Sequence, residues 1–98
     1  MSARRVIWKY NINTLGKFRV DMPAGAKPLH VEVQTPGQCA QMWVLCDPDA
    51  PLVRHRFCVY GTGHDRAVED WVGSYVGTWL EPPYVWHLFY EGEVNECQ

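Results

Sequence analysis

Seven stretches of the chain carry the hydrophobic pattern of β-strands. In most of them apolar and polar residues alternate, which places the apolar side chains on one face. The clearest case has Leu29, Val31 and Val33 on its apolar face, and Gly and Pro residues mark turns between the stretches. The stretches are residues 5–10, 16–21, 29–35, 39–46, 54–60, 71–79 and 84–90. The pattern therefore predicts an all-β fold, a small β-sandwich or partly closed barrel of six to seven mainly antiparallel strands.

Two details of the pattern predict how these strands are arranged. A short, turn-rich segment separates residues 5–10 from residues 16–21, and we expect the two stretches to pair as a hairpin. Residues 39–46 are apolar on both faces, which is typical of a strand in the centre of a sheet.

The chain departs from the strand pattern after residue 65. Residues 66–70 are compatible with a single helical turn. Beyond them, Gly73 and Gly77 weaken a regular strand, so we expect a bulge or a close backbone approach there. The apolar faces of the strands are expected to supply the core, namely Trp8, Val31, Val33, Trp43, Val44, Phe57 and Val59.

The length and composition indicate one folded domain. The chain has 98 residues and is 47% apolar, so we expect residues 1–98 to form a single β domain, with 91–98 as a polar, frayed tail. The N-terminus lacks the apolar run of a signal peptide, and no stretch approaches the about 20 apolar residues of a membrane span. We therefore expect a cytoplasmic protein that does not contact a membrane.

The charge balance bears on the choice of partner. A net charge of −2 disfavours nucleic acid, because binding to the phosphate backbone depends on a clustered excess of Lys and Arg. Alternation nevertheless puts Arg54 and Arg56 on the same face of one strand, so a small local anion site is compatible with the sequence.

The cysteines and histidines form no metal or catalytic motif. The four cysteines include no Cys-x-x-Cys pair, and no two of the four histidines are spaced to bind one ion locally. No segment resembles a nucleophile turn or an oxyanion hole. We therefore expect no catalytic residues, no metal site and no cofactor, with the cysteines as free thiols in a reducing compartment.

The most motif-like stretch is Gly61-Thr62-Gly63-His64, which Arg66 follows closely. Two glycines around a hydroxyl and an imidazole allow backbone N–H groups to converge on an anion, such as the phosphate of a nucleotide. The stretch lacks the Lys and the spacing of a P-loop, and it equally suits a strand-exit turn in which glycine takes a positive φ. These five residues are therefore candidate ligand-binding residues, with a plain turn as the alternative.

Aromatic residues are concentrated in the last third of the chain, with more area than one small core easily covers. An aromatic face that stays exposed would be a candidate protein interface, because aromatic side chains dominate the binding energy of such interfaces. The alternative is that these rings form the core. The candidate interface residues are Trp71, Tyr75, Trp79, Tyr84 and Trp86.

Five groups of short motifs, of which Ile-Trp-Lys-Tyr and Gly-Thr-Gly-His are two, occur together along the chain. They lie at residues 7–10, 22–26 with 29–34, 43–51, 56–64, and 75–78 with 85–89, and they span most of the chain from Val6 to Glu91. In these motifs the chain resembles a family of small, uncharacterised proteins that bacteriophages and prophages encode. The resemblance implies a phage-associated, cytoplasmic accessory protein and supplies no catalytic residues.

We therefore expect a non-enzymatic phage accessory module that binds a host or phage protein, with inhibition of a host defence system as one form of that role. The small size, the acidic balance and the aromatic excess favour a protein partner, and self-association into a homo-oligomer stays open. The alternatives are a small-molecule binder that holds a nucleotide or another anion at residues 61–66, and a structural component of the virion.

Overall fold

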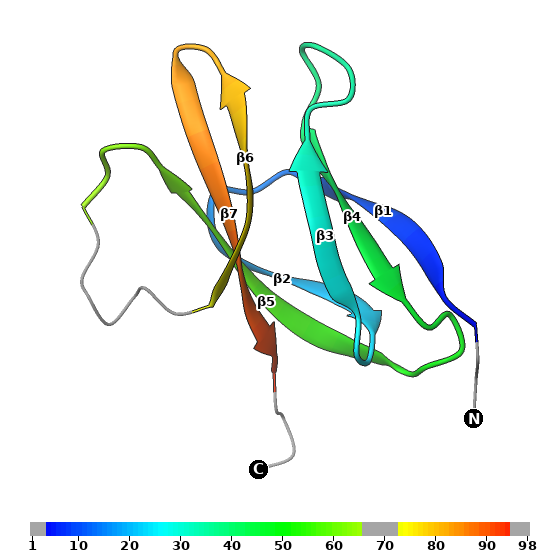
Figure 1. Ribbon diagram of the computed structural model, residues 1–98. Helices are drawn as coiled ribbons and strands as arrows, with labels where there is room; N and C mark the ends of the chain where they lie inside the picture. Colours follow the sequence, from blue (N-terminus) through cyan, green and yellow to red (C-terminus); the bar gives the residue numbers. More distant parts are fainter. Residues whose placement is uncertain (1–3, 66–72, 95–98) are drawn as a thin grey trace.

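The fold is a sandwich of two antiparallel β-sheets (Figure 1). The computed structural model describes residues 4–65 and 73–94, which form seven strands and no helix, so none of these residues belongs to a helix that could cross a membrane. All strand pairs are antiparallel, and the two sheets stay open, which confirms the all-β prediction. The strands are β1 (Val6–Ile12), β2 (Gly16–Pro23), β3 (Lys27–Glu32), β4 (Ala40–Cys46), β5 (Leu52–Gly61), β6 (Ser74–Glu81) and β7 (Tyr84–Glu93).

One sheet has three strands in the order β1-β4-β3, and the other has four strands in the order β2-β5-β7-β6. β4 therefore lies in the centre of its sheet, as its apolar character on both faces predicts. Its even-numbered residues, from Ala40 to Cys46, are buried, and the residues between them are half-buried on the opposite face.

The predicted hairpin between residues 5–10 and 16–21 is wrong. β1 pairs with β4, and β2 pairs with β5, so the chain passes from one sheet to the other between Ile12 and Gly16. Alternation demands only that each strand bury one face. Two strands in opposite sheets of a sandwich meet that demand as well as two paired strands do.

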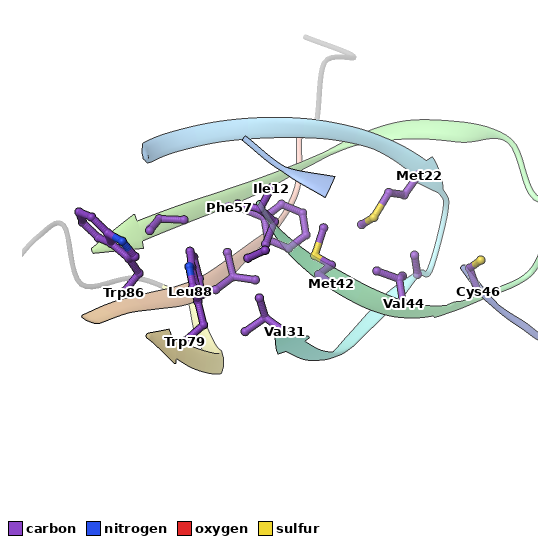
Figure 2. Close-up of a cluster of buried hydrophobic side chains, with 13 residues drawn as sticks. Ile12, Met22, Val31, Met42, Val44, Cys46, Phe57, Trp79, Trp86 and Leu88 are labelled. Carbon is purple, nitrogen blue, oxygen red and sulfur yellow. The ribbon is translucent and has the colours of Figure 1, made fainter. Parts of the chain in front are cut away.

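The core lies between the two sheets (Figure 2). Phe57, Met42, Val44 and Leu88 are fully buried and come from β5, β4 and β7. The predicted core residues Val31, Val44, Phe57 and Val59 are confirmed, and Val33 is half-buried against the same cluster.

Three residues expected in the core lie elsewhere. Trp8 faces the core side opposite Val44, but β1 is an edge strand and the side chain stays 39% exposed. Trp43 is half-buried on the outer face of β4, because Met42 and Val44 occupy the core face. Leu29 is exposed because a bulge between Pro28 and His30 breaks the alternation of β3.

One polar side chain, His55, is fully buried in the core region. Its Nε2 lies 3.2 Å from the carbonyl oxygen of Met22 and 3.1 Å from that of Pro23, so Nε2 carries a proton and donates to them. Its Nδ1 lies 2.8 Å from the hydroxyl of Tyr90. Burial, and then the nearby charge of Glu93, raise the pKa of Tyr90, which keeps this hydroxyl protonated and able to donate.

The last strand extends into the tail that was predicted for residues 91–98. β7 continues to Glu93, and the amide of Val94 donates to the carbonyl oxygen of Arg54 at 2.8 Å. The last four residues, with Cys97, lie outside the described residues, as does the helical turn expected at 66–70.

The two sheets come closest where β3 passes β6. A Cβ built on Gly77 of β6 would lie 2.6 Å from Cγ1 of Val31 on β3, so only glycine fits there. A bulge between Tyr75 and Gly77 accompanies this contact. The two glycines of this stretch predicted a bulge or a close backbone approach, and the structure has both.

Gly77→Ala is expected to lower the free energy of unfolding by about 1 to 3 kcal/mol, because the added methyl group overlaps Val31. Thermal or urea denaturation of the purified protein measures the change.

Val31→Ala provides the matched background for this test. It removes Cγ1, and the nearest atoms to the new methyl group are then the Val31 amide nitrogen at 3.5 Å and Cβ at 3.8 Å, which are ordinary contacts. Gly77→Ala should therefore cost little in the Val31→Ala protein. An equal cost in both backgrounds would show that the two sheets do not meet at this pair.

Candidate binding site at the end of the four-stranded sheet

The Gly61-Thr62-Gly63-His64 stretch forms a turn at the end of β5. The amide of His64 donates to the carbonyl oxygen of Gly61 at 3.2 Å, and Gly63 has a φ of 86°. This positive φ is the conformation that the turn alternative requires of a glycine.

The turn is tied to β7 through its backbone. The amide of Thr62 donates to the carbonyl oxygen of Val85 at 3.0 Å. Two amides of the stretch, those of Thr62 and His64, are thus engaged within the protein rather than directed together at an external anion. Arg66, the cation expected to assist an anion here, lies outside the described residues.

Side chains continue this link across the outer face of the sheet, the face that points away from the core. The His87 ring bridges two threonines, with Nε2 2.6 Å from Thr62 Oγ1 and Nδ1 2.9 Å from Thr78 Oγ1. The Thr78 hydroxyl also forms a hydrogen bond with the hydroxyl of Tyr75. Because a hydroxyl can donate or accept, this chain is complete with either tautomer of the neutral imidazole.

Gly61 lets the turn pack closely on β7. A Cβ at this position would lie 2.6 Å from His64 Cε1 and 2.9 Å from Trp86 Cζ3. The His64 ring meets the Trp86 ring edge to face, with 6.1 Å between their centres. The indole N–H of Trp86 donates to Glu81 Oε1 at 2.9 Å, which fixes the ring against the hairpin of β6 and β7.

The predicted aromatic interface is split between the core and the surface. Trp79 and Trp86 are 7% and 8% exposed, oppose each other across β6 and β7, and belong to the core, so their assignment to an exposed face is corrected. Tyr75 and Tyr84 are 59% and 58% exposed. The bulge after Tyr75 explains the difference, because it places Tyr75 and Trp79 on opposite faces of β6 despite their even spacing. Trp71 lies outside the described residues.

The exposed residues of the β6–β7 hairpin lie on its outer face and, with Tyr84, at its tip on the face that carries Trp86. Tyr75, Thr78 and Leu80 oppose Phe89, His87 and Val85, which alternate on the outer face of β7. Tyr84 lies at the hairpin turn and stacks on Trp86, with 5.6 Å between ring centres. We call Tyr75, Thr78, Leu80 and Tyr84 the hairpin surface.

Two shallow depressions flank the Gly61–His64 turn where it meets this surface. One, of about 300 Å³, reaches His87 and Phe89, and the other, of about 230 Å³, reaches Tyr84 and Trp86. The turn and the tyrosines, which the sequence suggested as two separate sites, are therefore connected: Tyr84 borders the turn directly, and Tyr75 reaches it through Thr78 and His87. Their hydroxyl and imidazole groups can exchange hydrogen bonds with a partner, and their rings offer apolar contact.

Sequence reasoning missed Thr78, Leu80 and His87. Each is an isolated residue on a strand, and only the pairing of β6 with β7 brings Thr78 opposite His87. The alternation of 84–90 did place His87 and Phe89 on the face opposite Trp86 and Leu88, but nothing in the pattern joined that face to Thr62.

The described residues include potential metal ligands and cysteines. In the ranges 4–65 and 73–94 no group of three or more His, Cys, Asp and Glu side chains could hold a metal ion. Cys39, Cys46 and Cys58 are free thiols, and burial, with the charge of Asp47, raises the pKa of Cys46.

The fold and the site together define a small β-sandwich domain with an aromatic and hydroxyl-bearing surface at one end. Residues 3–97 match the family described as Domain of unknown function (DUF7352), and the chain belongs to that family. No curated protein and no solved structure matches the chain.

Thr62→Val is expected to lower the free energy of unfolding by about 0.5 to 1 kcal/mol, because it removes the hydrogen bond that ties the turn to His87. Amide hydrogen exchange at His64 should become faster, since the turn then keeps its backbone links and the contact of His64 with Trp86 but loses its side-chain link to His87.

Thr14→Val is the control, because Thr14 is exposed and its side chain forms no hydrogen bond within the described residues. If both variants show the same stability and the same exchange at His64, the Thr62–His87 bond does not hold the turn.

Proposed function

We propose that this domain is a non-catalytic binding module that engages a protein partner through the hairpin surface. The observation that carries the proposal is the exposure of three large side chains, Tyr75, Leu80 and Tyr84, at 59%, 66% and 58%, on a single hairpin. The two tryptophans of the same hairpin already serve the core. The fold therefore does not require the exposed rings, whereas a partner could bury them.

The hairpin surface is prepared for binding. Tyr75 is held by Thr78 through its hydroxyl and contacts Phe89 edge to face, with 5.7 Å between ring centres. Tyr84 is held by its stack on Trp86. Rings that are already fixed lose little conformational entropy on association, which is how aromatic anchors contribute strongly to affinity.

The position of the hairpin supports the same role. Its turn lies at one end of the molecule, away from the start of β1 and the end of β7 (Figure 1). A partner can therefore approach it without displacing either of these strand ends.

The resemblance to small phage and prophage proteins supports the wider role that we propose for this module. In that role it is a phage-encoded accessory protein of the host cytoplasm, and its partner is a host or phage protein. Inhibition of a host defence system is one form of this proposal.

Tyr84→Ala and Tyr75→Ala are expected to abolish capture of the partner from a host lysate by the immobilised domain, because each removes an anchoring ring. Quantitative mass spectrometry of the captured proteins compares each variant with the wild type. Circular dichroism should show that both variants stay folded, since both side chains are largely outside the core.

Leu52→Ala is the matched control, because Leu52 is equally exposed, at 65%, but lies at the opposite end of β5 from the Gly61 turn. It should capture the same proteins as the wild type. Two results would contradict the hairpin surface as the contact. One is that the wild type and both tyrosine variants capture the same proteins, and the other is that Leu52→Ala loses the same proteins as the tyrosine variants.

A further inference from the structure

A basic cluster lies on the outer face of β2 and β5. The chain has a net charge of −2, yet four of its nine Lys and Arg residues are in these two strands. They point away from the core because Phe18 and Val20 on β2, and His55 and Phe57 on β5, take the core face. The cluster consists of Lys17, Arg19, Arg54 and Arg56.

The strand register sets two of these cations directly against each other. Arg19 is the cross-strand partner of Arg56, and Lys17 lies two residues from Arg19 on the same face. Like charges at opposed positions of an antiparallel pair are destabilising. Arg54, by contrast, opposes Asp21, and its Nε lies 4.0 Å from Asp21 Oδ1.

The other three cations form no ion pair within residues 4–65 and 73–94. There, no carboxylate oxygen lies within 4.0 Å of a side-chain nitrogen of Lys17, Arg19 or Arg56. An anion placed between them would remove the repulsion that the register creates.

The cluster also surrounds a hollow. A depression of about 470 Å³ is lined by Lys17, Arg19, Arg56 and Glu91, together with Phe18 and Phe57. Arg56 Nη2 donates to the backbone carbonyl of Glu91 at 3.3 Å, which restrains the guanidinium at the rim. Its remaining N–H groups form no side-chain hydrogen bond within residues 4–65 and 73–94, which leaves them to a ligand.

We propose that this depression binds a small organic phosphate. Arg19 and Arg56 donate hydrogen bonds to the phosphate oxygens, and Lys17 adds a third positive charge. Paired guanidinium groups match the geometry of phosphate oxygens. The volume exceeds what a bare phosphate needs and falls in the range of small-molecule sites, so the depression has room for an organic group beside the phosphate. Asp21 and Glu91 bound the positive region, which suits one phosphate rather than a nucleic-acid backbone. The inference goes beyond the proposed function, because it concerns β2 and β5 and not the hairpin surface.

The test is a titration of the domain at low ionic strength with inorganic phosphate, ribose 5-phosphate and AMP, followed by nuclear magnetic resonance. Saturable shifts are expected in the Arg19 and Arg56 Nε–Hε signals and in the amides of residues 17–19 and 56–58. Equal affinity for ribose 5-phosphate and AMP would indicate that the phosphate and sugar suffice, and tighter binding of AMP would indicate a nucleotide. Either result supports the proposal.

Arg19→Gln and Arg56→Gln should each weaken binding at least about fivefold, because each removes a charge-assisted contact to phosphate. Without ligand, each should raise the melting temperature, because the opposed like charges are relieved. Lys27→Gln removes an exposed charge from β3 of the other sheet and should change neither property.

Three results would overturn the proposal. The first is the absence of saturable shifts at millimolar ribose 5-phosphate and AMP. The second is an equal affinity of Arg19→Gln, Arg56→Gln and Lys27→Gln for these ligands. The third is a clear preference for single-stranded DNA over the small phosphates, which would assign the cluster to nucleic acid.

Discussion

The close approach of β3 and β6 is the constraint on which the rest of this structure depends. The two sheets share no strand, and the absence of a side chain at Gly77 is what allows β6 to lie against Val31. The bulge at the same place turns Tyr75 outward while Trp79 stays in the core. The contact that joins the sheets therefore also decides which aromatic rings of the β6–β7 hairpin remain available to a partner.

The two faces of the four-stranded sheet have different roles. The inner face contributes to the core, and the outer face carries the groups that we propose for binding. The inner face carries Phe57, Leu88 and the hydrogen-bonded His55, which stabilise the sandwich. The outer face has two regions. The basic side chains lie on β2 and the part of β5 near Arg56, and the hydroxyl, imidazole and aromatic groups lie on β6, β7 and the turn after Gly61. Cys58 and Tyr60 on this face are buried, whereas substitutions of its exposed residues can alter binding with small effects on stability, which makes the proposed surfaces accessible to mutagenesis.

Alternation along the chain predicts the strands well because most of them bury one face, and it correctly identifies Phe57 and Val59 as core. The apolar character of both faces of residues 39–46 correctly identifies β4 as central. Alternation does not specify which strands pair with each other. Residues 5–10 and 16–21 fit a hairpin and a sandwich equally, and only tertiary packing separates them. Bulges reverse the alternation at Leu29 and Tyr75, which sequence cannot locate to the residue. The turn at Gly61 to His64 could be found from its glycines, whereas its partners Thr78 and His87 depend on strand register.

The most direct measurement is a nuclear Overhauser experiment on the isolated domain with labelled valine methyl groups. The packing of β3 against β6 predicts strong contacts between the methyl groups of Val31 and the α protons of Gly77, and the pairing of β1 with β4 predicts contacts between the backbone protons of Trp8 and Val44. Contacts between the backbones of residues 6–10 and 16–20, with none between Val31 and Gly77, would contradict both the sandwich and the surfaces that it exposes.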